Sequence, residues 1–448
     1  SINRFVEGQP SRFTQNRGNS FLERPNEHYE FFIQDDWRPL RDLTLNLGLR
    51  YDYESARTEA LKEVTGSPGP GISRDKNNWA PRLGFAWTPG RSLKQVVYGG
   101  TGVYYDQIVL NIIGTARFTP PRIIGIRIDN PGWPDPLAGG GTIHPSGVSV
   151  IDVDLKTPYS WSSQVGYRRE LTKDLGLDVS FVYKREENQV AVLNTNAGLP
   201  GTADIFGAHP ERPDPTVGVR RFFTNLGFVR YKGLLVYLNK RFSHNMQGSL
   251  AYTLSSTVDN TSSFNDSIDV PSNPRLSNGP ASHDRRHRIR GNMKWVLPWK
   301  TELGAIVEYL SEEPLNIVAG GRDLDGDGST GDWVNEALCL NVSCPGFSYS
   351  RNSVRKLSTE EANRLRALFG LPPIAEYGNN PKLFNIDLTL QRRFRVGARR
   401  LRIAAHGFNV LNVPQRDQPA QNILSSNFGR HLSVSQPRAI QFIFQYEF

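Results

Sequence analysis

The sequence contains little of what marks helical membrane proteins, nucleic-acid binding proteins and enzymes. Among its 448 residues 38% are hydrophobic, and no run approaches the ~20 apolar residues that a membrane helix requires. The formal net charge is +9, but the basic residues are spread without a basic arm or helix, so we expect no nucleic-acid partner. No Ser or Cys nucleophile stands in a recognisable context and no Gly-rich phosphate loop opens a helix, so the sequence predicts no enzyme.

Aromatic and turn-forming residues are abundant instead, with 23 Phe, 16 Tyr, 8 Trp, 41 Gly and 30 Pro. Apolar and polar residues alternate in many segments, as in Leu303, Ala305 and Val307 against Glu302 and Glu308. Side chains on a strand alternate between its two faces, so each segment predicts a strand with one apolar and one polar face. Each segment is about ten residues long, which is the length that a tilted strand needs to cross a bilayer.

Thirteen such segments follow one another, and their connectors alternate between short and long. The expected strands lie near 29–38, 43–53, 79–88, 94–105, 159–169, 175–184, 230–241, 246–256, 286–296, 300–309, 382–394, 400–409 and 438–448. Outer-membrane barrels combine short periplasmic turns with long external loops, whereas a soluble sheet has no reason to alternate so regularly. We therefore predict an all-β fold for 1–448, a transmembrane antiparallel outer-membrane β-barrel with about 13–16 strands in this chain and long external loops.

The final strand carries Phe442, Phe444, Tyr446 and Phe448 on one face. It resembles the closing strand of bacterial outer-membrane barrels, whose assembly machinery recognises a C-terminal Phe, and this resemblance places the C-terminus in the periplasm. Counting back along alternating strands then places the long loops and Ser1 outside the cell. Single-chain bacterial barrels have an even strand number and both termini in the periplasm. We therefore expect a processed or truncated C-terminal part of a larger barrel; the alternative is an uncounted strand within 106–158 or 185–229.

Several segments together resemble the C-terminal barrel of TonB-dependent receptors, in particular the Oar-like group with a carboxypeptidase-regulatory-like N-terminal domain. They are YEFFIQDDW at 29–37, LTLNLGLRY at 43–51, WAPRLGF at 79–85, GGTGVYYD at 99–106, AYTLSS at 251–256, DRRHR at 284–288 and FNVLN at 408–412. The resemblance implies a barrel of about twenty-two strands around an N-terminal plug. It also implies uptake of a bulky ligand, driven by an inner-membrane complex through a short box before the plug.

This sequence contains neither the plug nor the box, so the TonB complex would act only through the missing part. We expect that this missing part, a plug with the upstream barrel strands, is either a separate partner chain, a piece removed by cleavage, or absent. The alternative function is a structural or interaction barrel without active transport, either split between chains or homo-oligomeric. In each case the expected location is the bacterial outer membrane, in contact with its lipid.

The sharpest candidate site lies in the long connector 310–381, which we expect to be an ordered external loop. Carboxylates at alternate positions followed by Gly are similar to the start of a calcium loop, although the Glu that completes an EF-hand is absent. We predict structural Ca²⁺ bound by Asp323, Asp325, Asp327, Ser329 and Asp332, with a solvated acidic turn as the alternative.

Two further features of the same connector predict order. Cys339 and Cys344 are the only cysteines, and an exported location is oxidising, so we predict a disulfide between them. Ser358 and Glu361 match a capping box, which predicts a helix that stops at Gly370.

The expected strand at 286–296 has a basic row on its polar face. Charges that face lipid at mid-membrane would cost about 2–4 kcal/mol each, so we predict that the row lines the lumen. Its members are Arg286, Arg288, Arg290 and Lys294. A basic lumen would attract anionic solutes or dock an acidic plug. The alternative is an ordinary water-filled wall with counter-charges from Asp52, Asp178, Glu308 and Asp387.

Overall fold

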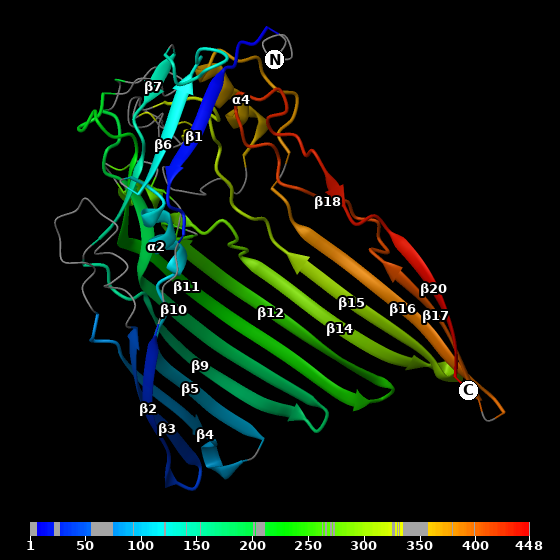
Figure 1. Cartoon of the computed structure of the whole chain (residues 1–448). Helices are drawn as coiled ribbons and strands as arrows, with labels where there is room; N and C mark the ends of the chain where they lie inside the picture. The colour runs from blue at the N-terminus through cyan, green and yellow to red at the C-terminus, as the bar shows by residue number, and fades with distance from the viewer. Residues whose placement is uncertain are drawn as a thin grey trace.

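The computed structural model of the chain consists of one large curved sheet with smaller folded elements at one end (Figure 1). It describes residues 7–21, 27–54, 75–92, 94–120, 122–139, 141–152, 154–199, 202, 211–261, 263–264, 267–268, 271, 274–324, 328, 330, 332–334, 357–378, 380–397 and 399–447. None of the helices within these residues is long and apolar enough to cross a membrane.

Thirteen strands of the large sheet follow one another in chain order, and every neighbouring pair is antiparallel. They are β2 (His28–Leu40), β3 (Leu43–Glu54), β4 (Trp79–Trp87), β5 (Gln95–Tyr105), β9 (Tyr159–Thr172), β10 (Leu175–Asn194), β11 (Arg220–Ser243), β12 (Met246–Asp259), β14 (His287–Leu297), β15 (Thr301–Leu310), β16 (Leu383–Val396), β17 (Arg399–Phe408) and β20 (Ala439–Glu447). All thirteen strands predicted from the alternation are therefore confirmed.

Tight turns join the strands at the end opposite the folded elements. Between β11 and β12, Ser243 pairs with Met246, so His244 and Asn245 alone form the turn. Both have positive φ, 52° and 61°, the left-handed geometry that twists a two-residue hairpin in the same sense as its strands. Beyond this turn β11 and β12 pair from Lys240 with Gly248 up to Val229 with Asp259.

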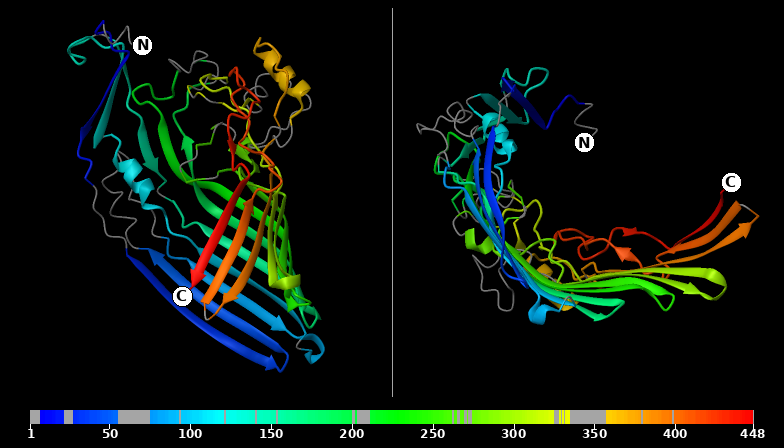
Figure 2. Two further views of the ribbon diagram at one scale, coloured as in Figure 1. Left: turned by 90° about the vertical axis from the view of Figure 1, so that its right-hand side faces the viewer. Right: turned by 90° about the horizontal axis from the view of Figure 1, so that it is seen from below.

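The sheet is an open arc, as the view from below in Figure 2 shows. Among the described residues β2 pairs only with β3, and β20 pairs only with β17, so both outer edges lack a neighbour. The fold class is the predicted antiparallel barrel wall, but the wall does not close on itself.

The connectors at the other end contain elements that the sequence did not predict. Outside the main path lie β1 (Arg12–Gly18), β6 (Ile123–Asp129), β7 (Thr142–His144), β8 (Val148–Ile151), β13 (Gly279–Pro280), β18 (Gln415–Arg416), β19 (Val434–Ser435), the helix α2 (Leu110–Arg117) and the 3-10 turn η2 (Pro274–Ser277). Two further 3-10 turns, η1 (Pro89–Arg91) and η3 (Pro298–Lys300), lie in the tight turns at the opposite end. The strands β1, β6 and β7 form a separate three-stranded sheet, which stands away from the wall (Figures 1 and 2). We call this sheet the finger.

Two hydrophobic cores hold the connectors together. The first packs α2 and β8 on the upper parts of β10 and β11, with Ile112, Ile151, Val192 and Phe223 at its centre. The second joins connector 310–381 to connector 410–437 beneath the helix α4 (Thr359–Leu368). The predicted helix is confirmed, because Ser358 accepts from the backbone N–H of Glu361 and the Glu361 carboxylate accepts from that of Ser358.

Candidate functional site

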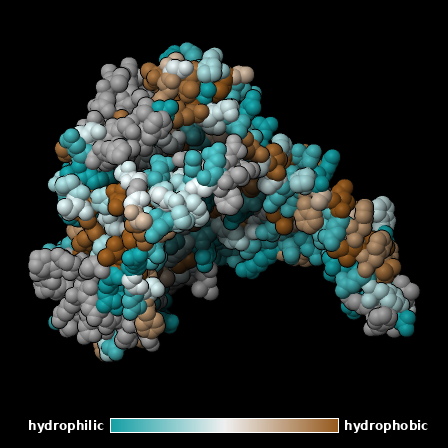
Figure 3. Space-filling view, turned by 45° about the horizontal axis from the view of Figure 1, so that its top comes forward, coloured by the Kyte–Doolittle hydropathy of each residue, from teal (hydrophilic) through white to brown (hydrophobic). Residues whose placement is uncertain are grey.

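The two faces of the sheet differ in chemistry. On one face apolar side chains stay open to the surroundings, such as Val165 at 50%, Phe181 at 45% and Leu250 at 44% exposure. On the other face polar side chains bond across the strands. Figure 3 looks into the hollow of the arc, where most visible residues are hydrophilic, while apolar residues gather along the outer margin of the arm at the right. We refer to the two faces as the apolar face and the polar face.

Aromatic side chains border the apolar face at the upper ends of the strands. Cross-strand pairs follow one another there, with ring centroids 4.7–6.4 Å apart: Tyr29 with Tyr53, Tyr51 with Trp79, Tyr105 with Tyr159, and Trp161 with Tyr183. Paired aromatic rings add about 0.5–1.5 kcal/mol beyond the area they bury. Aromatic girdles of this kind flank the lipid-facing band of membrane barrels at the headgroup level.

A second border lies near the tight turns, where Trp37, Trp87, Trp295 and Trp299 remain 42–79% exposed. The strand β4 carries one tryptophan of each border, because it begins at Trp79 and ends at Trp87. Eight residues span about 26 Å along a strand. With a tilt of about 40° this gives a height near 20 Å, comparable with the ~25 Å apolar band of outer-membrane barrels.

On the polar face a ladder of hydrogen bonds and ion pairs crosses the last five strands. Lys294 lies 3.1 Å from Glu302, the amide of Gln391 donates to Glu302, and Arg402 Nε donates to Gln391 Oε1 over 2.9 Å. Arg402 also reaches Gln445 on β20, at 3.4 Å. Each of these charged side chains thus has a hydrogen-bonding or oppositely charged partner on a neighbouring strand. Such pairing offsets the cost of partly removing the charges from water.

Other cations of the polar face also have acidic partners. Arg50 pairs with Asp52 at 2.8 Å, Arg168 with Asp178 at 2.6 Å, and Arg290 with Glu308 at 2.6 Å. These acids are three of the four proposed as counter-charges. The fourth, Asp387, instead accepts from Asn385 and from the backbone of Asn409. The wall therefore carries balanced pairs rather than a uniformly basic lining.

The four residues of the predicted basic row occupy different environments. Arg290 and Lys294 lie in β14 and are paired as above, while Arg288 donates to the carbonyl of His283 at 3.3 Å. Arg286 is exposed and precedes the strand, which begins at His287. That these residues line a lumen stays a prediction.

The polar face is hollowed between β11 and β17. A groove of about 660 Å³ runs over Asn239, Ser249, Asn292, Thr389 and His406, among other residues. Its floor is amide and hydroxyl groups, and Asn292 Nδ2 donates to Ser249 Oγ over 2.7 Å. The lining also includes apolar residues, among them Ile306 and Leu388, so the groove offers both polar and apolar contacts.

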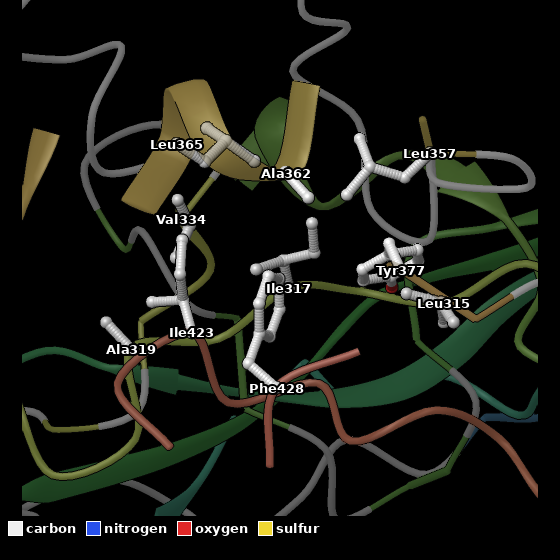
Figure 4. Close-up of a cluster of buried hydrophobic side chains, with 10 residues drawn as sticks. All are labelled: Leu315, Ile317, Ala319, Val334, Leu357, Ala362, Leu365, Tyr377, Ile423 and Phe428. Atoms are coloured by element: carbon white, nitrogen blue, oxygen red, sulfur yellow. The ribbon is translucent and has the colours of Figure 1, made fainter. Parts of the chain in front are cut away.

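The second core forms a cap above the wall, shown in Figure 4. Leu365 and Ala362 of α4 point down towards Ile317, Ile423 and Phe428. Arg366 is 5% exposed and donates to three carbonyl groups, those of Pro372 (2.8 Å), Ile423 (2.7 Å) and Ser425 (3.3 Å). Burial raises the pKa of Tyr377 to about 12, because the phenolate would lose its hydration there.

The predicted calcium loop leads into this cap. Asp323 and Asp332 are each 4% exposed; Asp323 accepts from the backbone N–H of Gly328 at 2.7 Å, and Asp332 from that of Leu324 at 2.5 Å. Both carboxylates therefore turn inward. Asp325, Asp327 and Ser329 lie outside the described residues, as do Cys339 and Cys344. Calcium binding and the disulfide stay predictions.

One ion pair ties the cap to the wall. Arg285, just before β14, lies 2.8 Å from Glu313 and donates to the carbonyl of Ser311 over 2.7 Å. Asn380 donates to the carbonyl of Glu313 over 2.8 Å. Because Ser311 and Asn380 stand at the two ends of connector 310–381, this cluster fixes both stems of the cap. The sequence showed the DRRHR segment but not this role, which depends on contacts far apart in the chain.

The C-terminal strand places its predicted aromatic row on the apolar face of the free edge. Phe442 and Phe444 are 69% and 72% exposed and Tyr446 is 42% exposed. Phe448 lies outside the described residues. The exposure of this row, on an edge strand bonded to β17 alone, is typical of a strand that meets lipid on one side and a neighbouring strand on the other.

Comparisons with known proteins agree with this geometry. A family model described as an outer membrane beta barrel domain matches residues 1–441. The TonB-dependent transporter Oar of Myxococcus xanthus is 25% identical over 264 residues, which cover 50% of this chain and 22% of that protein.

Solved structures show the same fold at low identity. The outer membrane transporter YddB from Escherichia coli superposes with a TM-score of 0.52 at 13% identity, covering 94% of this chain and 44% of that chain. The ferric enterobactin receptor PfeA from Pseudomonas aeruginosa gives a TM-score of 0.52 at 12% identity, covering 94% and 45%. The chain thus spans less than half the length of each relative described.

Proposed function

This chain belongs to the outer membrane beta barrel domain family, and from that premise we propose that it forms part of the wall of a TonB-dependent transporter-like barrel for a bulky ligand. The observation that carries the proposal is the meander of thirteen antiparallel strands with an aromatic-bordered apolar face and a polar face of balanced charges. The relatives described are transporters and receptors, and we propose no catalytic role.

In this proposal the apolar face meets outer-membrane lipid and the polar face lines the lumen. The cap, the finger and the first hydrophobic core stand outside the cell, and the tight turns and C-terminus stand in the periplasm. Ligand capture falls to these folded elements, which carry exposed aromatic residues such as Trp133 and Phe118. The TonB complex would act through a plug, which belongs to the part of the barrel beyond these strands.

The strand directions limit how the wall is completed. Twelve successive antiparallel pairings make β2 and β20 run in the same direction. Joining these two edges would create a parallel seam, and leaving them open in hydrocarbon would cost several kcal/mol for each unsatisfied backbone group. Antiparallel closure requires an odd number of further strands, and about nine would give the twenty-two of outer-membrane transporters.

The same parity weighs against a barrel built only from copies of this chain. Copies inserted in one membrane share one orientation, so every edge that they offer runs in the same direction. We therefore favour completion by a different segment, whether on a longer polypeptide or on a partner chain, over a homo-oligomeric wall.

The native outer-membrane assembly tests the proposal. We expect intact mass and unheated gel electrophoresis of the purified assembly to show this wall together with further strand-forming sequence and a plug, in one heat-modifiable species. A closed, heat-modifiable barrel consisting of the 50.3 kDa chain alone would contradict it. Protease added to intact cells should cleave the external elements and leave the barrel folded. Loss of ligand binding without loss of the folded barrel would show that these elements bind ligand and are not required for assembly.

A further inference from the structure

The finger has a polar side with an unusual concentration of hydrogen-bonding groups. In the pairing of β1 with β6, Arg12 stands opposite Asp129, Thr14 opposite Arg127 and Asn16 opposite Gly125. In the pairing of β6 with β7, Arg127 stands opposite His144. Paired residues share a face and alternate residues repeat it, so all of these groups lie on one side.

Asp129 organises the cations on this side. Its Oδ1 accepts from Arg12 Nε over 3.0 Å, its Oδ2 accepts from Arg127 Nη2 over 2.8 Å, and His144 Nε2 lies 3.0 Å from Oδ2. The bonds from Arg127 and then Arg12 hold the pKa of Asp129 well below its usual range. One carboxylate therefore holds two guanidinium groups by hydrogen bonds, and the His144 imidazole lies beside them.

The cluster retains a net positive charge and remains accessible. Two arginines face one carboxylate, and after pairing their side chains are still 55% (Arg12) and 46% (Arg127) exposed. Arg12 reaches Asp129 through Nε alone, so its terminal amino groups point beyond the pair. Guanidinium groups present a planar fork that matches an oxyanion with two parallel hydrogen bonds.

The shape of the surface favours an extended ligand. The three strands of the finger lie about 4.8 Å apart, and the residues on this side repeat along each strand over about 13 Å. The surface is therefore a flat face and not a pocket. At its centre Gly125 leaves the space of a side chain open beside Asn16 and Ser146. Flat faces of Arg, Asn, Thr and Asp suit sugar rings, whose hydroxyl groups need both donors and acceptors.

We propose that this side of the finger binds an acidic carbohydrate, with Arg12 and Arg127 on its carboxylate or phosphate group and Thr14, Asn16 and His144 on neighbouring hydroxyls. A repeating acidic chain would engage several molecules at once, so a weak single contact suffices for retention. The site is separate from ligand passage through the wall and does not depend on it.

Binding to three polysaccharides tests the proposal, using the native outer-membrane assembly in detergent micelles. We expect polygalacturonate or phosphorylated mannan to bind more tightly than neutral dextran, the first marking a carboxylate ligand and the second a phosphate ligand. Arg12→Gln with Arg127→Gln should weaken that binding about tenfold or more, the loss of two charge-assisted hydrogen bonds. The control Arg17→Gln with Arg364→Gln removes two exposed cations elsewhere, one in the finger and one on α4. Its affinity for the acidic polysaccharides should stay within about twofold of that of the unaltered protein.

A second variant guards against misfolding of the first. Thr14→Glu puts an anion on the same side without removing any member of the cluster, and it should also weaken binding of the acidic polysaccharides but not of dextran. No preference over dextran, equal losses in the two double variants, or full binding by Arg12→Gln with Arg127→Gln would each overturn the proposal.

Discussion

At the scale of single residues, Tyr377 makes the cap sensitive to alkali. Its hydroxyl is buried and has no hydrogen-bond partner among the residues that the structure describes, and its pKa is raised from 10.0 to about 12. A raised pKa means that the folded cap prefers the proton, so this stability is complete below pH 10 and is lost as the pH rises towards 12. We expect the free energy of unfolding of the cap to fall by about 2–3 kcal/mol between pH 9 and pH 12.

The control is Tyr377→Phe, which keeps the ring against Phe428 and removes the titrating group. Urea titrations followed by the methyl resonances of Ile423 and Leu365 report on the cap itself. The variant should lack the additional alkaline loss. Parallel losses in both proteins would show that other groups control the alkaline sensitivity.

The predicted calcium site also depends on individual side chains. Asp323 and Asp332 turn inward and accept backbone N–H groups of the loop, and Ca²⁺ would take further carboxylate and carbonyl oxygens from the same loop as ligands. We expect bound calcium by metal analysis after dialysis, and faster proteolysis of 310–381 after chelation. Asp323→Asn with Asp332→Asn should abolish both effects, whereas Glu360→Gln on the surface of α4 should change neither. Calcium-free protein whose cleavage is unaffected by chelator would favour the solvated acidic turn.

At the scale of elements, neighbouring residues of one strand should respond oppositely to charge. Leu250 of β12 lies on the apolar face and is 44% exposed, while Ser249 lies on the polar face beside Asn292. In a lipid-facing position a lysine costs about 2–4 kcal/mol, and in a water-filled lumen close to nothing. We expect Leu250→Lys to lower the free energy of folding into bilayers by that amount and Ser249→Lys to change it by less than about 1 kcal/mol.

Urea titrations in lipid vesicles measure this difference between two adjacent positions of the same strand. The register places the two positions on opposite faces of the sheet, because Leu250 pairs with Leu238 and Ser249 pairs with Asn239 of β11. The two variants therefore differ only in which face carries the lysine. Equal costs for the two lysines would mean that the two faces do not meet different solvents.

The strands and the wall were predictable because the information is local. Alternation of apolar and polar residues within about ten positions specifies a strand and its faces, and the Ser358–Glu361 capping box specifies the start of α4. The finger was missed because β1 pairs with β6, more than a hundred positions away in the chain. The upper halves of β10 and β11 were missed because α2 and β8 pack on them, which removes the simple alternation. The Arg285–Glu313 anchor depends in the same way on distant contacts.

At the scale of the whole molecule, the orientation in the membrane follows from the alternation of tight turns and folded caps. Ser435 of β19 lies in the long connector 410–437 and is exposed, and Lys173 lies in the tight turn between β9 and β10 and is also exposed. In the proposed orientation a membrane-impermeant maleimide added to intact cells reaches the first position and not the second. Single cysteines at Ser435→Cys and Lys173→Cys test this, with Cys339→Ser and Cys344→Ser removing the native cysteines.

We expect labelling of Ser435→Cys in intact cells and of both variants after the outer membrane is opened. The reversed pattern would place the tight turns outside and would also reverse the direction of β20, whose end would then no longer face the periplasm. Labelling of both positions in intact cells would mean that the wall does not seal the bilayer. Labelling of one position alone in intact cells is consistent with a closed wall, and because β2 and β20 run in the same direction, such a wall contains an odd number of strands beyond these thirteen.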